Sequence, residues 1–563
     1  MIILFEDYAY RPQDLPQLEG IEPTELRNGM LKFSYVGYYY EAASGEMVFI
    51  LPKVLIVEGK AIGRYEPERL LAWGVGNEPI ASADAAVLFE LSVWIYEAVA
   101  RFNKRHMDNE ITSRRTMVGV ASHRGDDGAT LLDHILALTR YNSEHQSLFT
   151  YIASVMHSGL RNIHWAKTIR TTAPIGSKNR PFYVDYLAKE KTINFDEELI
   201  CLFYSTLNYL KYAYCVAAQC NVNYPIEKPH CVADLIASGK GTRRLRKIRG
   251  KYFTNELVRL WNILYAFYDR AERVARAKRS CERLLVRNFN IVFEDMIDCL
   301  IGDARMPKGV KAQKDGKLVD HIYKDQSVVD GESIYFIGDS KYYRSRGAFG
   351  ENVMYKQFTY ARNVIQYHID IFNGFLDGEQ LRYRDELTEG YNPTPNFFIR
   401  GMVDISDLSF GDSKLRQDSR RRCLNVHFNN RLFDRDTLFV LVYDINFLYV
   451  LAAYVQDRGY SMGIKRELRS RFREDIIRAF EDEYQFYVVR PRRQSNEEFV
   501  ARHFKKIIGK IYQTANRKLI LALSKRDEAS NAQLVAFLRS SAWLEATELK
   551  RIAGMAALPE GES

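Results

Sequence analysis

Apolar residues in the first part of the chain follow the two-residue period of β-strands. Between residues 27 and 58, Leu31 and Phe33 alternate with polar residues, and small residues around Ser44 and Gly45 separate two apolar runs. Alternation bounded by turn-forming residues is typical of half-buried strands joined in a hairpin. We therefore expect a β-hairpin whose tip lies near Ser44 and Gly45.

A helical pattern begins at Ser82, a residue suited to cap a helix. From there to Phe102 the apolar residues recur every three or four positions, as on the buried face of a helix. Similar patterns predict long helices at 129–158, 195–220 and 253–283.

Beyond residue 284, helical and strand patterns alternate. A helix ending near Leu300 and a basic loop precede two strand-like runs, at 318–329 and 333–338, and a helix follows at 352–367. Further runs with strand character lie at 396–400 and 437–443. The last part of the chain has helical patterns at 462–482, 497–524 and 530–553.

These patterns predict a mixed α/β protein of several domains. We divide it into a small β-rich amino-terminal domain (1–80), a mainly helical middle region (81–283), an α/β core (284–460) and a helical carboxy-terminal region (461–563). At about 150 residues per domain, 563 residues have room for three or four such units.

Charge is distributed unevenly along the chain. Residues 1–80 contain twelve acidic and seven basic residues, whereas the whole chain carries a net charge of +9. The first domain is therefore not expected to touch a polyanion, while the rest has the basic character that binds phosphates. The densest basic run includes Arg243, Arg244, Arg246 and Lys247. These four residues either contact DNA phosphates or form a solvated helix face.

Several classes of protein are disfavoured. No uninterrupted apolar stretch reaches the roughly 18 residues of a membrane span, and the amino terminus lacks the basic and cleavage regions of a secretory signal. We therefore expect a cytoplasmic protein without membrane contact. The seven cysteines form no C-x-x-C pair and do not cluster with histidines. A zinc site and a disulfide framework are disfavoured, and buried free thiols are expected.

The most informative stretch is the apolar run 333–338 and the polar residues after it. It ends in Asp339-Ser-Lys341, and residues two apart on a strand point to the same face. Asp320 opens the preceding strand, and Glu294 lies on the helix before it. Such carboxylates, with waters and phosphate oxygens, can hold Mg²⁺, while Lys341 orients or deprotonates an attacking water. The alternative is an ordinary surface Asp and Lys.

The tetrapeptide Gly-Asp-Ser-Lys occurs twice, at 338–341 and at 411–414. The second copy has no apolar strand before it and is predicted to lie in a loop, so it serves as a control for the first. Asp325 and Asp330 follow Asp320 closely, and they are alternatives for the first acid.

Several segments carry a resemblance to a known family. They are Phe293-Glu294, Asp320-His-Ile-Tyr323, Ile337-Gly-Asp-Ser-Lys-Tyr-Tyr343 and Tyr355-Lys-Gln-Phe-Thr-Tyr-Ala-Arg-Asn363. Together they resemble the PD-(D/E)XK nuclease core of McrC-like restriction subunits, most closely the LlaJI-type restriction endonucleases. Tyr35-Val-Gly-Tyr38 and Ile50-Leu-Pro-Lys-Val54 are similar to the amino-terminal part of McrC proteins. The chain departs from the pattern at Val319, where many such nucleases have proline, and at Ala361, where many have tyrosine.

The resemblance implies a DNA endonuclease that requires Mg²⁺ or Mn²⁺. It places Asp320, Asp339 and Glu294 as metal ligands and Lys341 beside them. Gln357 would orient the lysine, the alternative being a solvent-facing helix residue.

The resemblance also implies a bacterial restriction system that defends against phage. In such systems a McrB-like AAA+ GTPase hexamer recognises and moves double-stranded DNA, and the amino-terminal region of the nuclease subunit binds that hexamer. The present chain has no G-x-x-x-x-G-K-[ST] phosphate loop, so its motor would be a separate protein. A hairpin that exposes Tyr38, Tyr39 and Tyr40 is the candidate docking surface. The alternative is that these rings pack inside a small β domain.

Two other functions remain open. One is a non-catalytic activator of the AAA+ partner, against which the retained Glu294, Asp320, Asp339 and Lys341 argue. The other is a stand-alone DNA repair nuclease of the same fold, against which the McrC-like amino terminus argues.

Overall fold

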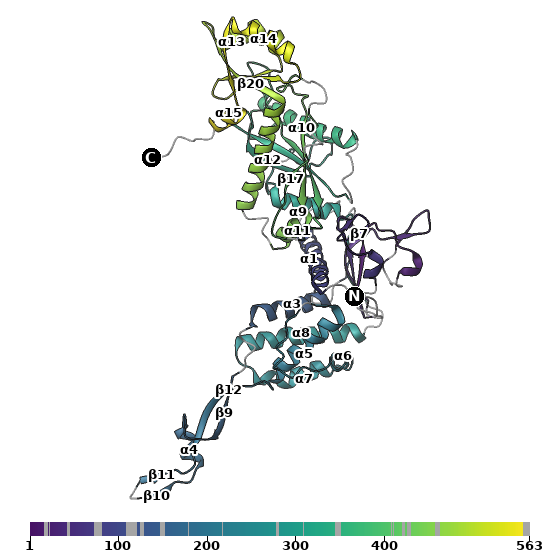
Figure 1. Cartoon of the computed structure of the whole chain (residues 1–563), viewed down its shortest axis with the longest axis vertical. Helices are drawn as coiled ribbons and strands as arrows, with labels where there is room; N and C mark the ends of the chain where they lie inside the picture. The colour runs from purple at the N-terminus through teal and green to yellow at the C-terminus, as the bar shows by residue number, and fades with distance from the viewer. Residues whose placement is uncertain are drawn as a thin grey trace.

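The protein is a mixed α/β chain whose units follow one another along a long axis (Figure 1). A carboxy-terminal unit lies at one end, and a thin arm from the middle of the chain lies at the other. Among the residues described below, no helix is both long and apolar enough to cross a bilayer. The computed structural model describes residues 1–15, 21, 23–41, 45–71, 82–107, 121–123, 129–146, 152–177, 180–216, 218–276, 281–307, 309–343, 351–406, 408, 410–418, 423–424, 430–456 and 462–555.

The amino-terminal unit is a five-stranded sheet that includes strands from far along the chain. The predicted hairpin is confirmed, because β4 (Tyr35–Glu41) pairs antiparallel with β5 (Glu46–Leu51). The expected tip residue Ser44 lies outside the described residues. The sheet order is β1-β5-β4-β13-β8, with β1 at Ile2–Phe5, β13 at Cys281–Arg287 and β8 at Ala121–His123. This unit also contains short strands and 3₁₀ helices: η1 (Pro12–Asp14), β2 (Thr24–Glu25), β3 (Leu31–Lys32), η2 (Lys53–Leu55), β6 (Ile56–Val57), β7 (Lys60–Ala61) and η3 (Pro67–Leu70).

The tyrosines of β4 are buried on both faces of this sheet. Tyr38 and Tyr39 are fully buried, and Tyr40 is 7% exposed. The Tyr38 ring packs against Phe49 and against Tyr96 of α1 (Ser82–Met107), which covers one face. The expectation that Tyr38, Tyr39 and Tyr40 form an exposed docking surface is therefore wrong, because both faces of their strand are covered by the chain itself.

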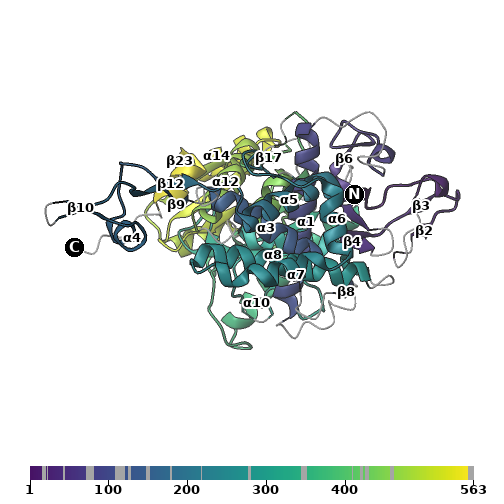
Figure 2. The ribbon, with the colours of Figure 1, turned by 90° about the horizontal axis from the view of Figure 1, so that it is seen from below.

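A helical bundle and an arm follow α1. The helices predicted at 129–158, 195–220 and 253–283 are confirmed, but they end earlier than expected, at Glu144, Tyr214 and Arg276. Strands β9 (Ile152–Ser158) and β13 follow the first and the third of them. The bundle helices are α3 (Leu131–Glu144), α5 (Glu198–Tyr214), α6 (Pro229–Ala237), α7 (Lys240–Ile248) with η5 (Arg249–Lys251), and α8 (Asn255–Arg276). Between α3 and α5 an antiparallel ribbon of β9 (Ile152–Ser158) and β12 (Leu187–Ile193) projects from the bundle (Figures 1 and 2). It carries α4 (Trp165–Thr171), β10 (Ile175–Ser177) and β11 (Arg180–Phe182).

The central unit is a six-stranded mixed sheet between helices, as the alternating pattern predicted. The strand order is β14-β15-β16-β19-β17, with β18 also paired to β19. Helix α10 packs on the face that bears Phe398 and Val442. Phe472 of α12 stacks on Phe397 on the opposite face. The elements are α9 (Asn290–Ile301), β14 (His321–Gln326), β15 (Ser333–Lys341), α10 (Glu351–Phe372), β16 (Asn396–Met402), β17 (Arg416–Gln417), β18 (Cys423–Leu424), β19 (Phe439–Asn446), α11 (Phe447–Val455) and α12 (Met462–Glu483).

The carboxy-terminal unit contains a sheet that the helical prediction for 461–563 missed. Helix α12 is confirmed, but the helices predicted over 497–524 and 530–553 are each interrupted by strands. The chain runs β20 (Tyr484–Pro491), α13 (Asn496–Ile507), β21 (Ile511–Gln513), β22 (Leu519–Ser524), α14 (Glu528–Arg539), β23 (Ala542–Thr547) and α15 (Leu549–Met555). The antiparallel order β21-β22-β20-β23, in a β-α-β-β-α-β chain, is that of ferredoxin-like folds.

Candidate active site

The two predicted acids meet at one end of the β14–β15 hairpin. His321 lies opposite Gly338, and continuing this register by one residue places Asp320 opposite Asp339. Directly opposed residues of an antiparallel pair point to the same face. The Asp320 carboxylate also accepts a hydrogen bond from the backbone N–H of Ser340, at 3.2 Å. The hairpin alone therefore brings the two carboxylates together.

Lys341 lies on the same face as Asp339. Its Nζ forms an ion pair with Asp339 Oδ2 and lies 5.4 Å from the centre of the Phe398 ring on the neighbouring strand. The Lys341 side chain is 12% exposed and that of Asp339 is 2% exposed. The ion pair with this buried carboxylate places the Lys341 ammonium group directly beside Asp339.

Helix α10 covers this face and contributes two further groups. Gln357 is buried, so the alternative of a solvent-facing helix residue is wrong. Its amide nitrogen donates to the Ile337 carbonyl at 3.2 Å and to Asn396 Oδ1 at 3.1 Å, which ties α10 to two adjacent strands. Lys356 Nζ lies 3.8 Å from Asp339 Oδ1. Asp339 thus faces two lysines.

Electrostatics at the site reflect this crowding of charges. The pKa of Asp320 is raised, first by burial and then by the negative charges of Asp339 and Glu294. Burial lowers the pKa of Lys356, but its hydrogen bond to Tyr360 and the charges of Asp339 and Asp320 raise it overall. The acids repel one another and hold the nearby lysine protonated.

Glu294 and His321 lie at the edge of the site. Glu294 is half-buried on α9 and affects Asp320 through its charge. The His321 imidazole contacts the Ser340 hydroxyl, and its Nδ1 lies 3.5 Å from Asp298 Oδ1. These contacts lie on the face of β15 opposite Asp339 and join α9 to the hairpin.

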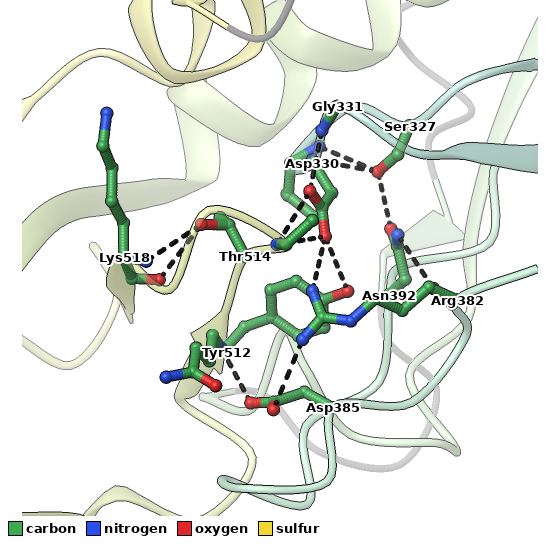
Figure 3. A network of polar contacts seen from close by, with 12 residues as sticks. Ser327, Asp330, Gly331, Arg382, Asp385, Asn392, Tyr512, Thr514 and Lys518 are labelled. Carbon is green, nitrogen blue, oxygen red and sulfur yellow. Dashed lines mark hydrogen bonds and ion pairs between the residues drawn. The ribbon is translucent and has the colours of Figure 1, made fainter. Parts of the chain in front are cut away.

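The alternative first acids lie elsewhere. Asp325 is opposite Ile334 and therefore on the other face of the hairpin from Asp320. Asp330 lies in the connection between β14 and β15, at the far end of the hairpin from Asp339. Its carboxylate accepts hydrogen bonds from Arg382 and Tyr512, at 2.9 and 3.1 Å (Figure 3). Of the three aspartates considered, Asp320 is the one beside Asp339.

The second Gly-Asp-Ser-Lys copy is in a loop, as predicted. Lys414 has a positive φ of 42° and pairs with Asp404 at 3.1 Å. Its side chain is 14% exposed, close to the value for Lys341. The two lysines therefore match in burial and differ in surroundings.

Sequence reasoning missed two charged residues beside the site. Arg400 on β16 is paired in register with Lys341 and is almost completely buried. An arginine that ends the apolar run Asn396-Phe-Phe-Ile-Arg400 was the available signal for it. For Lys356 the signal was its position one residue before Gln357, but only the packing of α10 shows that it faces Asp339.

The predicted basic run forms α7 in the bundle, far along the chain from the acids. Arg244 is held by Glu198 and Glu227, at 3.0 and 2.8 Å. Arg243, Arg246 and Lys247 are exposed. Arg244 is therefore held between two acids, whereas the three exposed cations have no carboxylate within ion-pair distance among the described residues, although Arg243 donates to backbone carbonyls and Arg246 to the Tyr265 hydroxyl.

Five cysteines among the described residues are free thiols, of which Cys299 is buried and four are half-buried. Within the same residues, no group of three or more His, Cys, Asp or Glu side chains is arranged to hold a metal ion.

No protein-family model matches the chain, and no curated protein is significantly similar to it.

Proposed function

We propose that this chain is the DNA-cleaving subunit of a restriction system, with a PD-(D/E)XK-type active site at the end of β14 and β15. The observation that carries the proposal is that Asp320, Asp339 and Lys341 share one end and one face of a hairpin. A carboxylate pair with an adjacent lysine is suited to phosphodiester hydrolysis, in which a water must be activated while negative charge develops on phosphate.

The acid pair fits a divalent cation held by few protein ligands. Asp320 and Asp339 repel each other, and a bound cation would remove that repulsion. Mg²⁺ is usually held by one or two carboxylates with waters and phosphate oxygens, so a third carboxylate is not required. Glu294 then acts on Asp320 through its charge, rather than as a third ligand.

When bound, Mg²⁺ would supply Lewis-acid stabilisation of the phosphate charge. The residues of the chain do the rest. From its position beside Asp339, Lys341 Nζ orients the attacking water and offsets the developing charge. Gln357 holds α10 against β15 and β16, and thereby keeps Lys356 close to Asp339.

The test uses the two matched lysines. The full chain, combined with a copurified AAA+ partner, DNA, Mg²⁺ and GTP, should cleave DNA. Lys341→Ala should lower the cleavage rate by at least about 100-fold, the usual effect of losing a catalytic acid or base. Lys414→Ala should leave it near the wild-type rate. Equal losses from both variants, or full activity in Lys341→Ala, would refute the site.

A non-catalytic activator is the competing function. It is favoured by the ion pair between Lys341 and Asp339, which engages the lysine that a nuclease would use. For an activator, Asp339→Asn would leave the partner's nucleotide hydrolysis and the survival of infected cells unchanged. For a nuclease, the same variant would stimulate the partner and yet fail to protect the cells.

We further propose that an AAA+ partner docks on the arm rather than on the buried tyrosines. Residues 152–193 contain seven Lys and Arg residues against two acids. The described part of the arm also has six apolar side chains that are more than half exposed: Leu160, Trp165, Ile169, Ile175, Phe182 and Val184. Exposed apolar side chains gathered on one projecting element are typical of a protein interaction site.

The arm can be shortened without touching the bundle. Ser158 pairs with Leu187, so a short Gly-Ser turn can replace residues 159–186. This variant should lose stimulation of the partner's GTP hydrolysis and keep its melting temperature. Phe253→Ser is the control, because Phe253 is 86% exposed on the bundle. Stimulation that survives removal of the arm would exclude it as the docking element.

A further inference from the structure

The residue that follows Lys341 is anchored to the amino-terminal sheet. The Tyr342 hydroxyl donates a hydrogen bond to Glu6 Oε2 at 2.5 Å, across 336 residues of sequence. The backbone N–H of Lys53 donates to the Tyr342 hydroxyl at 3.1 Å and to the same Glu6 oxygen at 3.4 Å. The end of β15 is thus bonded to two segments of another unit.

Packing encloses this contact. The Tyr342 ring lies 5.7 and 6.0 Å from the rings of Phe289 and Phe293, and Lys53 Nζ lies over its face at 5.1 Å. Tyr342 is 6% exposed and Glu6 is 5% exposed. A carboxylate buried to this degree is costly unless it is hydrogen-bonded, so the Tyr342 hydroxyl and Glu6 stabilise each other.

Tyr342 is joined directly to Lys341 and so connects this contact to the active site. Fixing the backbone at Tyr342 limits the directions that the neighbouring Lys341 side chain can take. The regular strand β15 ends at Lys341. Tyr342 is therefore the first residue after the strand, where an outside contact has most influence on the orientation of its last side chain.

We propose that Tyr342 and Glu6 are positioning residues, which hold Lys341 against Asp339 by tying the end of β15 to the amino-terminal sheet. The proposal rests on the nuclease function proposed above. It makes the amino-terminal unit part of the active-site framework, in addition to any part it has in partner binding.

The test measures how readily Lys341 reacts with a lysine-specific acylating reagent, by mass spectrometry on the full chain without partner or DNA. Lys414 is the internal reference, since the two side chains are 12% and 14% exposed. Tyr342→Phe keeps the ring and removes the donor. It should raise the Lys341 labelling rate by about fivefold, the effect of losing one buried hydrogen bond, and leave Lys414 unchanged.

A second variant refines the result. Glu6→Gln keeps an acceptor oxygen for Tyr342, so Lys341 should label at a rate between those of the wild type and Tyr342→Phe. Equal Lys341 rates in all three proteins would overturn the proposal. Equal acceleration of Lys341 and Lys414 would also overturn it, because it would show general loosening of the fold.

Cleavage gives an independent reading. Tyr342→Phe should lower kcat by about 10- to 100-fold, the usual effect of a small misplacement, with KM for DNA unchanged. If the wild-type chain does not cleave DNA at all, the proposed function fails, and the labelling result still decides the positioning role. A raised KM with unchanged kcat would show that the contact serves DNA binding instead.

Discussion

Arg400 carries its charge inside the central sheet. Its guanidinium donates to Asp444 at 2.7 Å and to Asp418 at 2.9 Å, and the residue is 1% exposed. Because Arg400 lies in register with Lys341, this buried ion group borders the candidate active site. It links β16 to β19 and to the segment that follows β17, next to the face that bears Lys341.

Replacing Arg400 tests how much this group stabilises the fold. Arg400→Met should lower the free energy of unfolding by about 3–5 kcal/mol, because the buried Asp444 and the half-buried Asp418 both lose the guanidinium charge. Urea titration measures this. Arg384→Met is the control, since Arg384 pairs with Glu389 near the surface, where such pairs contribute about 0–1 kcal/mol. Similar losses in both variants would show that burial adds nothing to the Arg400 group.

His368 provides a prediction about pH. It is buried among Tyr335, Tyr367 and Tyr383, and burial lowers its pKa to about 4. The His368 imidazole takes up a proton near pH 6.5 in the unfolded chain but only near pH 4 in the folded chain. The free energy of unfolding is therefore highest at neutral pH, and it falls as pH falls from about 6.5 to about 4. Between pH 7 and pH 5 His368 should account for a loss of about 2 kcal/mol. Urea titration of His368→Phe should show a correspondingly weaker pH dependence.

Helix α7 shows how an element limits what its charges can do. Arg244 is occupied by Glu198 and Glu227, so at most Arg243, Arg246 and Lys247 are available to phosphates. Replacing those three with Ala should lower the slope of log affinity against log salt by about 3, because each phosphate contact contributes about 0.9. Arg244→Ala should change the slope little and destabilise the bundle. A slope unchanged by the triple variant would leave α7 as a solvated face.

Elements with a strong local period were predictable from sequence, and those defined by distant partners were not. Helices α1, α5 and α12 and the hairpin of β14 and β15 follow from local patterns. Strand β13 does not, because its partner β4 is far away in sequence. Strand β22, Leu519–Ser524, is an uninterrupted apolar run that periodicity cannot distinguish from a buried helix.

The same division applies to the candidate site. Asp320, Asp339 and Lys341 belong to one hairpin, so spacing alone brought them together. Lys356 and Arg400 reach the site through the packing of α10 and the pairing of β16, which no local pattern reports. Burial of Tyr38 depends on α1, whose position over the sheet was likewise invisible in the sequence.

At the scale of the whole molecule, Asp330 joins the central and carboxy-terminal units (Figure 3). Besides Arg382 and Tyr512, its carboxylate accepts from the backbone N–H of Ala515 at 3.2 Å, while Asp385 accepts from that of Gln513 at 2.7 Å. These bonds attach β21 and the following turn to the central unit.

Breaking this junction should separate the two units. Asp330→Ala removes the buried acceptor of Tyr512 and of the Ala515 N–H, while Arg382 keeps its ion pair with Asp385, at a cost of about 1–3 kcal/mol. Hydrogen exchange should then show earlier opening of 484–547 than of the central sheet. Asp404→Ala, which removes a surface carboxylate paired with Lys414, is the control. Uniform opening of both units in Asp330→Ala would show that other contacts dominate the junction.

The route of the amino-terminal sheet has a consequence during synthesis. Tyr38 of the hairpin pairs with Leu284, which leaves the ribosome only after the bundle and the arm have been made. At about 5–20 residues per second, the hairpin waits on the order of 10–50 s for its neighbour. During that time β4 presents an unpaired edge rich in tyrosine, the kind of edge that invites aggregation. Newly made chains should therefore depend on chaperones until residue 287 has emerged, and truncation before that residue should yield insoluble protein.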